Sequence, residues 1–223
     1  HFRRIIDANH GHFGLMNDIQ QDLLRILEAG NSAPSGENCQ PWHFVVRGSS
    51  IEIHLLPERD QSAYSWGQRT SYLANGAAIE NMVIAASIER YRTEVAYFPK
   101  QGDTWHVATI TCIKDQSVKT DELAPYVNKR ISNRKPYEKT PITNEDREKL
   151  LAAVTEAGYG SLALAEKKED IHRLGRIGST NEEVMLANRS LHQFFFSHVS
   201  WTKEEDEKKK VGFYIKTLEL PLP

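Results

Sequence analysis

The sequence predicts an α+β protein. Two segments, 18–29 and 72–91, place apolar or small residues at helical spacing, whereas four shorter runs are rich in β-branched and aromatic residues. These runs are 43–46, 51–56, 93–98 and 105–114. The chain has 223 residues, of which 39% are hydrophobic, so it is long enough to bury a sizeable core.

The first helix is expected over residues 18–29. Asn17 is a suitable N-cap, and Gln20 stands at the reciprocal position of a capping box. An apolar stripe runs through Leu23 and Leu27, and Gly30 is expected to end the helix in the left-handed conformation.

The next elements follow a segment, 31–42, that is too rich in turn-forming residues to be regular. The runs 43–46 and 51–56 then predict two strands, and 72–91 predicts a long helix. This helix carries glycine and alanine at 76–78 and alanine at 85–86, and small residues allow close helix packing, so we expect it to be central.

A second module is expected from residue 121, giving modules at 1–120 and 121–223. Thr143 and Asp146 predict a capped helix that ends at Gly158, much as the first helix ends near Gly30. This parallel suggests an internal duplication.

Beyond Gly158 the pattern is less regular. Residues 161–166 are expected to form a strand, and 169–199 a mostly helical segment interrupted near Gly178 and Ser179. The charged run 203–210 is typical of a solvated helix or loop.

Composition excludes several function classes. Lys plus Arg is 28 and Asp plus Glu is 30, so the net charge of -2 indicates neither nucleic acid nor an anionic membrane as partner. No apolar run is long enough for a membrane span, and the two cysteines have no CxxC spacing, so we expect a cytoplasmic protein. His10 and His12 lack a carboxylate or thiol at ligand spacing, so no metal centre is expected.

The segment 33–42 is the first candidate binding site. The amides of Asn38 and Gln40 both donate and accept hydrogen bonds, as the edge of a planar heterocycle requires, and Gly36 would admit a ring close to the backbone. On the residues alone we favour an ordinary turn in which Asn38 bonds its own backbone. Ser35 has no histidine nearby in sequence to activate it as a nucleophile.

A second candidate is the basic segment 130–134. In an extended chain Arg130, Ser132 and Arg134 would point to one side, which suits a phosphate group. A solvated basic edge strand explains the pattern equally well.

Together these motifs resemble the nitroreductase family of FMN-dependent oxidoreductases. The segment 33–44 resembles the family's APSxxNxQPWxF loop, 76–86 resembles its central helix, and 130–134 resembles its RRSxR phosphate motif with Ile131 in place of the second arginine. The resemblance implies a sandwich of a mixed, mainly antiparallel sheet and long central helices.

The order of the motifs is reversed relative to ordinary family members, in which RRSxR comes before the APSxxNxQPW loop. This order implies a tandem, internally duplicated member in which one chain imitates the usual homodimer, with the second module incomplete. The reciprocal site is lost, because Arg3 and Arg4 are not followed by SxR.

The resemblance also implies which residues form the FMN-binding site. The flavin ring and the FMN phosphate would be bound by Pro34, Ser35, Gly36, Asn38, Gln40, Arg130, Ser132 and Arg134. No catalytic side chain is expected, because the flavin carries the chemistry. NAD(P)H would be the hydride donor and a small molecule, such as a nitroaromatic or quinone, the acceptor, in a pseudo-dimeric monomer or a homodimer. Two alternatives remain open: a flavin-binding or storage protein without turnover, and a pseudo-dimer without flavin that serves as a scaffold.

Overall fold

The computed structural model describes residues 18–62 and 65–219, and its contacts divide the chain into two units. Unit 1 contains the chain up to Asn133 together with His198–Leu218, and unit 2 contains Arg134–Ser197 and the chain from Glu219. This division does not test the modules 1–120 and 121–223, which stay a prediction. The N-cap assigned to Asn17 and the residues Arg3, Arg4, His10 and His12 lie outside the described residues.

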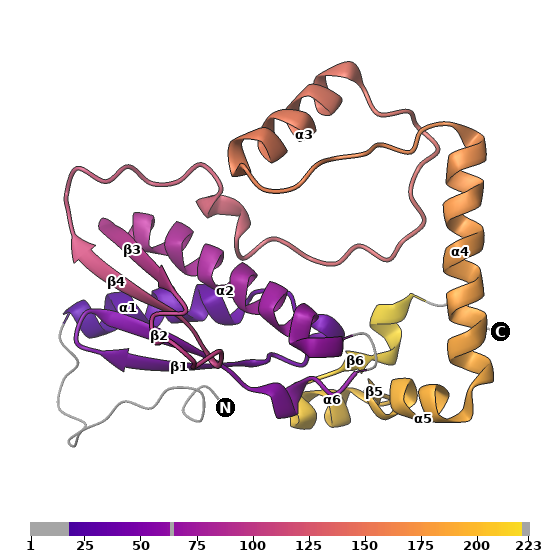
Figure 1. The fold of residues 1–223 in the computed structure, drawn as a ribbon, viewed down its shortest axis with the longest axis horizontal. Coiled ribbons are helices and arrows are strands. Elements are labelled where there is room, and N and C mark those ends of the chain that lie inside the picture. Colours follow the sequence, from indigo (N-terminus) through magenta and orange to yellow (C-terminus); the bar gives the residue numbers. More distant parts are fainter. Residues whose placement is uncertain (1–17, 63–64, 220–223) are drawn as a thin grey trace. The chain divides into compact units, whose positions relative to one another are not determined.

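Unit 1 is built on a four-stranded antiparallel sheet in the order β1-β2-β4-β3 (Figure 1). The strands are β1 (Trp42–Arg47), β2 (Ser50–Leu55), β3 (Tyr91–Tyr97) and β4 (His106–Lys114). β1 and β2 form a hairpin in which Trp42 pairs with Leu55 and Arg47 with Ser50. The α+β class predicted from the sequence is therefore confirmed, with every pairing in this sheet antiparallel.

Two helices pack on one face of this sheet. α2 (Arg69–Ile88) contacts β2, β3 and β4, and α1 (Asp18–Asn31) packs along α2. The alternating burial of β2, whose Ile51, Ile53 and Leu55 are buried, shows that one face of the sheet points to the helices. Helices and strands share one core whose largest fully buried members are Leu23, Ile26, Leu27, Trp42, Phe44, Ile51, Ile53, Ile79, Met82 and Ile110.

Gly30 does not end α1, contrary to the sequence-based expectation. The helix continues to Asn31, and Gly30 is not among the residues with positive φ. A Cβ at this position would lie 2.7 Å from Cγ of Met82, which is fully buried on α2. Gly30 is therefore required for the close approach of α1 and α2 and not for a left-handed cap.

A buried carboxylate ties α1 to the sheet. Asp22 accepts hydrogen bonds from Tyr91 Oη at 3.0 Å and from Lys114 Nζ at 2.8 Å, and it pairs with Arg25. Arg25 also donates from Nε to Glu89 at 2.6 Å. This network links residues from α1, β3 and β4 with Glu89, which follows the end of α2.

Residues 198–218 complete unit 1. β5 (Val199–Ser200) and β6 (Phe213–Tyr214) form a short parallel pair, and α6 (Lys203–Lys209) lies between them in sequence. The charged run 203–210 is thus mainly a helix with exposed charges, which is one of the two forms expected for it.

Unit 2 consists of helices joined by irregular segments. α3 (Asn144–Ala157) is capped as predicted, because Thr143 Oγ1 accepts from the Asp146 N–H at 3.1 Å and Gly158 has φ 73°. The strand expected at 161–166 is wrong, since this segment is irregular and mostly exposed. α4 (Lys168–Ala187) continues through Gly178, so the expected interruption there is also wrong.

The helix break lies instead at Asn188. Its backbone is extended, with φ -81° and ψ 117°, and its side chain accepts from the N–H groups of Ser190 and Leu191 at 3.0 and 3.1 Å. Asn188 therefore ends α4 and caps α5 (Arg189–Ser197), whereas the glycine at 178 is tolerated inside a helix.

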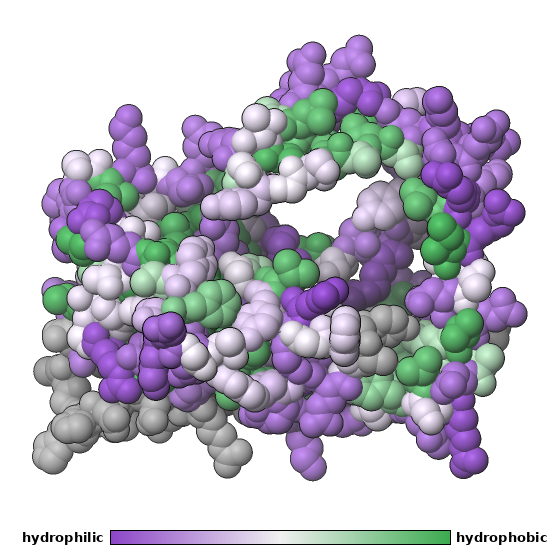
Figure 2. All heavy atoms as spheres, in the orientation of Figure 1, coloured by the Kyte–Doolittle hydropathy of each residue, from purple (hydrophilic) through white to green (hydrophobic). Residues whose placement is uncertain are grey.

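Both α3 and α4 carry exposed apolar residues, which Figure 2 shows as hydrophobic patches among hydrophilic side chains. These residues are Leu150, Leu151, Ile171, Leu174, Ile177, Val184 and Leu186. Within the described ranges, no helix combines the length and apolar character that crossing a membrane would require.

Candidate functional site

The segment 33–41 forms a tight loop whose shape is fixed by its own hydrogen bonds. The Ser35 hydroxyl accepts from the Gln40 N–H at 3.0 Å, and the Ser35 carbonyl accepts from the Asn38 N–H at 3.1 Å. The Gly36 carbonyl accepts from the Cys39 N–H at 2.9 Å, closing the short 3-10 turn Gly36–Asn38. Ser35 is thus used as an anchor on both its side chain and its main chain.

Three residues of this loop other than glycine have left-handed backbones. Glu37 has φ 50°, Asn38 has φ 53° and Gln40 has φ 49°. Residues with a Cβ occupy this region at a cost of roughly 1–2 kcal/mol each, and such strain is concentrated at functional sites. The surrounding structure must therefore hold the loop in place.

The loop is held at both ends. Asn75, fully buried on α2, donates from Nδ2 to the Pro41 carbonyl at 3.0 Å. Trp42 donates from Nε1 to Asn31 Oδ1 at 3.1 Å, and Asn81 donates from Nδ2 to the Ala29 carbonyl at 3.0 Å. Side chains of α2 and the end of α1 thus fix where the loop leaves the helix and where it enters β1.

A third support comes from residues 198–218. Gln40 donates from Nε2 to the Lys210 carbonyl at 2.8 Å, and His198 Nε2 lies 3.7 Å from Glu37 Oε2. Burial raises the pKa of Glu37, the charge of His198 opposes this, and the carboxylate of Asp60 adds to it. Proton uptake by Glu37 would therefore alter the pairing between the loop and His198.

The start of α2 lies close to the loop and is organised by Asp60. Its carboxylate accepts from Ser71 Oγ at 2.8 Å and from Thr70 Oγ1 at 2.9 Å. Burial opposes ionisation of Asp60, but hydrogen bonds from Ser65, Ser71 and Thr70 outweigh it and hold the pKa below its usual value. Asp60 thus remains an anion that stabilises the positive end of α2.

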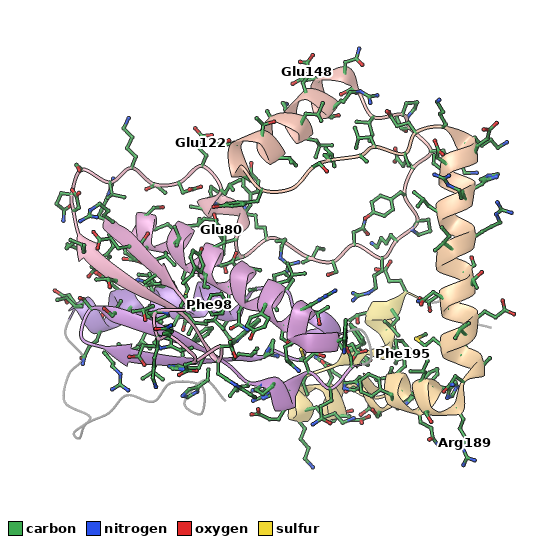
Figure 3. The ribbon with its side chains drawn as sticks, viewed as in Figure 1. Glu80, Phe98, Glu122, Glu148, Arg189 and Phe195 are labelled. Atoms are coloured by element: carbon green, nitrogen blue, oxygen red, sulfur yellow. The ribbon has the colours of Figure 1, made fainter. Side chains whose placement is uncertain are left out.

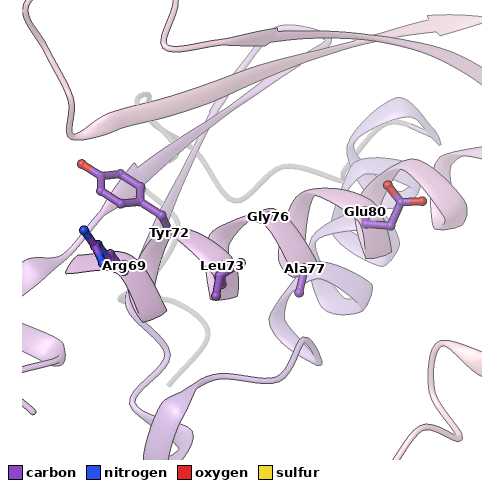
Figure 4. Close-up of a pocket in the computed structure, with 6 residues that line it drawn as sticks. All are labelled: Arg69, Tyr72, Leu73, Gly76, Ala77 and Glu80. Carbon is purple, nitrogen blue, oxygen red and sulfur yellow. The ribbon is translucent and has the colours of Figure 1, made fainter. Parts of the chain in front are cut away.

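A shallow, wide-open depression, called the groove below, runs along the exposed face of α2 beside this loop. One part, of about 770 Å³, is lined by Arg69, Tyr72, Leu73, Gly76, Ala77 and Glu80 (Figure 4). An adjoining part, of about 260 Å³, is lined by Pro34, Ser35, Gly36, Thr70, Leu73, Ala74 and Ala77. The two parts share Leu73 and Ala77, so together they form one mainly apolar surface that extends from the loop along the helix.

Aromatic residues stand around the first turns of α2. Tyr72 donates from its hydroxyl to the Thr104 carbonyl at 3.2 Å, and its ring lies 5.9 Å from that of Phe98. Phe98, labelled in Figure 3, directly follows β3. Arg69 lies over the ring of Trp66 at 5.3 Å, and Trp66 is 78% exposed. A flat apolar ligand would find both a small-residue floor and aromatic neighbours here.

The structure brings five of the eight predicted site residues into this loop. Pro34, Ser35 and Gly36 line the groove, whereas Asn38 and Gln40 shape the loop, with the Gln40 amide bonded to Lys210. A Cβ on Gly36 would meet no atom within 4 Å, so the backbone there is open to a ligand.

Two of the three predicted phosphate residues, Arg130 and Ser132, belong to unit 1 but are not among the residues that line the groove. Arg130 and Ser132 are exposed in the irregular chain after the 3-10 turn Ala124–Tyr126 of unit 1. Arg134 belongs to unit 2. No strand is present at 130–134, so the alternative of a basic edge strand is wrong. The assignment of these residues to a phosphate stays a prediction.

Sequence reasoning missed part of the groove. Thr70, Leu73 and Ala77 line it, and His198 and Lys210 support the loop. The small residues at 76–78 predict close helix packing, and Ala78 is indeed fully buried, whereas Gly76 and Ala77 lie on the exposed side of α2 and line the groove. The contacts of His198 and Lys210 join segments over 150 residues apart, for which a single sequence carries no signal.

The chain is similar to curated proteins of Mycobacterium tuberculosis. It is 29% identical over 198 residues to an uncharacterized protein, covering 87% of this chain and 27% of the relative. It is 27% identical over 141 residues to a protein named "Putative NAD(P)H nitroreductase", covering 62% of this chain and 40% of the relative. It is also 28% identical over 78 residues to "Putative NAD(P)H nitroreductase acg", covering 35% of this chain and 24% of the relative. The chain thus spans less than half the length of these relatives.

These names support a nitroreductase-like family for the chain, as its motifs suggested, whereas the tandem arrangement stays a prediction. No family model matches the sequence. Two solved structures align with this chain at TM-scores of 0.37, too low to establish a common fold. One is a "putative nitroreductase in complex with fmn" from Desulfovibrio desulfuricans, with 20% identity and coverage of 61% of this chain and 95% of that one. The other is a "Putative NADH Oxidase" from Clostridium acetobutylicum, with 13% identity and coverage of 50% and 85%.

Proposed function

We propose that this chain is part of an FMN-dependent oxidoreductase that transfers a hydride from NAD(P)H, through the flavin, to a small acceptor such as a nitroaromatic or quinone. The observation that carries the proposal is the groove in which Pro34, Ser35 and Gly36 lie beside the apolar, small-residue face of α2. The relatives named as nitroreductases support the same class of chemistry.

The residues present fit the ring portion of FMN. Gly36 leaves open space at the backbone, and Leu73, Ala74 and Ala77 offer an apolar surface to one face of a planar ring. When bound, FMN would supply hydride acceptance and donation, and the protein would supply orientation and electrostatics. Arg130, Ser132 and Arg134 are the candidates for the phosphate by resemblance of their motif, and the charge of two guanidinium groups suits that role.

The chain's own residues would act on a bound ring in distinct ways. The strained loop holds its backbone in a fixed shape, because Ser35 and Gln40 lock it and Asn75 and Lys210 anchor it. Such a fixed backbone orients a ligand without a reorganisation cost at the moment of binding.

The first test is FMN binding with the groove blocked. Leu73, 74% exposed in the centre of the groove, is replaced by Glu, and exposed Leu151 on α3 is replaced by Glu as the matched control. FMN fluorescence quenching should show binding at least about tenfold weaker for L73E, because a carboxylate would be placed against an apolar ring. L151E should bind FMN like the unaltered chain. Equal affinity in L73E, or no binding by the unaltered chain, would refute the site.

The second test addresses the phosphate. R130A/R134A should bind FMN at least about 100-fold more weakly, since each charge-assisted hydrogen bond contributes about 1.5 to 3 kcal/mol. R173A/R176A removes two exposed arginines of α4 and serves as the control. Riboflavin, which lacks the phosphate, should bind R130A/R134A and the unaltered chain equally. An unchanged FMN affinity in R130A/R134A would remove the phosphate assignment while leaving the ring site intact.

The third test separates turnover from storage. Bound FMN is mixed with NADH or NADPH without air, and loss of the oxidised flavin absorbance establishes a hydride-accepting site. A flavin that stays bound and oxidised would indicate a flavin-storage protein and would refute the oxidoreductase.

Sedimentation of the same preparation distinguishes a pseudo-dimeric monomer from a homodimer. We further propose that the protein works in the cytoplasm, as the absence of a disulfide between the free thiols of Cys39 and Cys112 would allow.

A further inference from the structure

A second constellation of polar residues lies on the face of the sheet opposite the helices. His54 on β2 and His106 on β4 are cross-strand partners, and their rings stack with centroids 4.5 Å apart. Glu52 stands two residues before His54 and therefore on the same face, with its Oε2 3.1 Å from His54 Nε2. The neighbouring residues Ile51 and Ile53 point into the core, so this triad faces away from α2.

A β-bulge creates this arrangement. Along β2 and β4 the partners are Glu52 with Thr109 and Ile53 with Ala108, but His54 pairs with His106 and skips Val107. Val107 and Ala108 are both buried, whereas a regular strand would alternate. The extra residue turns His106 back to the outer face beside His54. Bulges commonly re-aim a side chain in this way.

We propose that Glu52, His54 and His106 form a binding site for a divalent transition metal, with Zn²⁺ as the best match. One ligand atom from each residue lies within 4.8 Å of the others. A tetrahedral zinc ion with bonds of about 2.0–2.1 Å places its ligands roughly 3.3 Å apart. The separation of 3.1 Å between Glu52 Oε2 and His54 Nε2 matches this spacing, and a ligand atom of His106 lies within 4.8 Å of both.

The donor set decides the class of ion. Two imidazole nitrogens and one carboxylate oxygen suit zinc and related transition metals, whereas Mg²⁺ and Ca²⁺ favour oxygen ligands alone. Three protein ligands leave a fourth position for water or another small ligand. The His54 and Glu52 side chains are 30% and 19% exposed, so the ion can enter from solvent.

Outer contacts hold two of the ligands in place. Arg47 donates from Nε to Glu52 Oε1 at 2.8 Å, which leaves Oε2 directed toward His54. Thr109 Oγ1 lies 2.9 Å from His106 Nε2, so the hydroxyl can fix the orientation of that ring. Such hydrogen bonds to ligands are typical of metal sites and set the direction of the ligating atoms. The site is separate from the groove and does not depend on the proposed flavin chemistry.

Zinc titration by calorimetry tests the proposal. The protein carries H10A/H12A, because these two histidines are close in sequence and offer a competing pair. This protein should bind one Zn²⁺ per chain at micromolar concentration or tighter. H54A/H106A should lose that equivalent, and E52Q should bind at least roughly tenfold more weakly, since even changes in the outer shell cost 10–100-fold.

The matched control is H172A, which removes an exposed histidine of α4 and should leave the zinc affinity unchanged. Circular dichroism identifies any variant that fails to fold, and the isosteric E52Q then decides the question. In wild-type background, Zn²⁺ should also shift the ring NMR signals of His54 and His106. Absence of a stoichiometric zinc site would overturn the proposal. So would a zinc affinity in H54A/H106A and in E52Q equal to that of the protein that retains Glu52, His54 and His106.

Discussion

The contact between Gly30 and Met82 leads to a prediction in which one substitution has opposite effects in two backgrounds. In G30A the new Cβ would lie 2.7 Å from Met82 Cγ, far inside the 3.5–4.0 Å at which carbon atoms pack. Met82 is completely buried, so its side chain cannot move aside into solvent.

The magnitude follows from two opposing terms. Overpacking a core costs about 1–3 kcal/mol, and replacing glycine by alanine in a helix gains about 0.5–1 kcal/mol. G30A should therefore lower the free energy of unfolding by about 1–2 kcal/mol. In M82A, which itself costs about 2–5 kcal/mol, the clash is absent and G30A should stabilise the protein by about 1 kcal/mol. The coupling between the two sites is then roughly 2–3 kcal/mol.

Urea unfolding followed by circular dichroism measures the four members of this double-mutant cycle. G76A is the control, because Gly76 lies within α2 and a Cβ there would meet nothing within 4 Å. It should stabilise the protein by about 1 kcal/mol. If G30A lowers stability equally with and without Met82, or raises it in the unaltered chain, the close approach of the two helices at Gly30 is refuted.

Three further predictions concern charge, thiol reactivity and backbone conformation. D22N should lower the free energy of unfolding at pH 7 by about 1–2 kcal/mol, because charged hydrogen bonds to partly exposed partners are lost. Burial opposes the ionised form of Asp22, but its cationic and hydroxyl partners outweigh it and hold the pKa below its usual value. This stability is present above the unfolded pKa of about 3.9 and is lost as pH falls through the folded pKa, so pH-dependent urea titrations should show the two proteins converging in acid. Burial raises the pKa of both Cys39 and Cys112 to about 11, so Ellman's reagent at pH 8 should label the folded chain slowly and the urea-unfolded chain at once. G212A should destabilise residues 198–218, since Gly212 has φ 85° and a Cβ would overlap the His198 carbonyl, and limited proteolysis should cut this segment faster.

Each of these has a clear contrary result. A constant difference between D22N and the unaltered chain from pH 7 to pH 2 would show that the charge of Asp22 is not responsible. Rapid labelling of native thiols would contradict their burial, and proteolysis of G212A at the original rate would contradict the strained turn.

Much of unit 1 could be predicted from local sequence. The strands 43–46 and 51–56 and the helix 72–91 lie within a few residues of β1, β2 and α2, because the periodicity of their apolar residues reflects the single core they share. The capped helix that begins after Thr143 could also be predicted from the sequence, since its cap residues form hydrogen bonds within one turn.

The two errors at glycine residues have different physical causes. Gly30 has the same local signature as a C-cap, and only its contact with Met82, 52 positions further on, gives it a different role. Gly178 was expected to interrupt a helix, yet a helix tolerates an exposed glycine for about 1 kcal/mol. The candidate groove shows the same limit. The loop residues Ser35 and Gly36 were found by their motif, whereas Thr70 and Lys210 reach the site only through tertiary folding.

The left-handed backbone of Glu37, Asn38 and Gln40 also bears on which sequences this loop accepts. β-branched residues are excluded at all three positions, because their Cβ substituents clash in that conformation. Glycine would fit each position without backbone strain. It would, however, remove the Glu37 carboxylate that lies 3.7 Å from His198 Nε2 and the Gln40 amide that donates to the Lys210 carbonyl. The loop thus keeps a strained backbone together with side chains at 37 and 40 that connect it to residues 198–218.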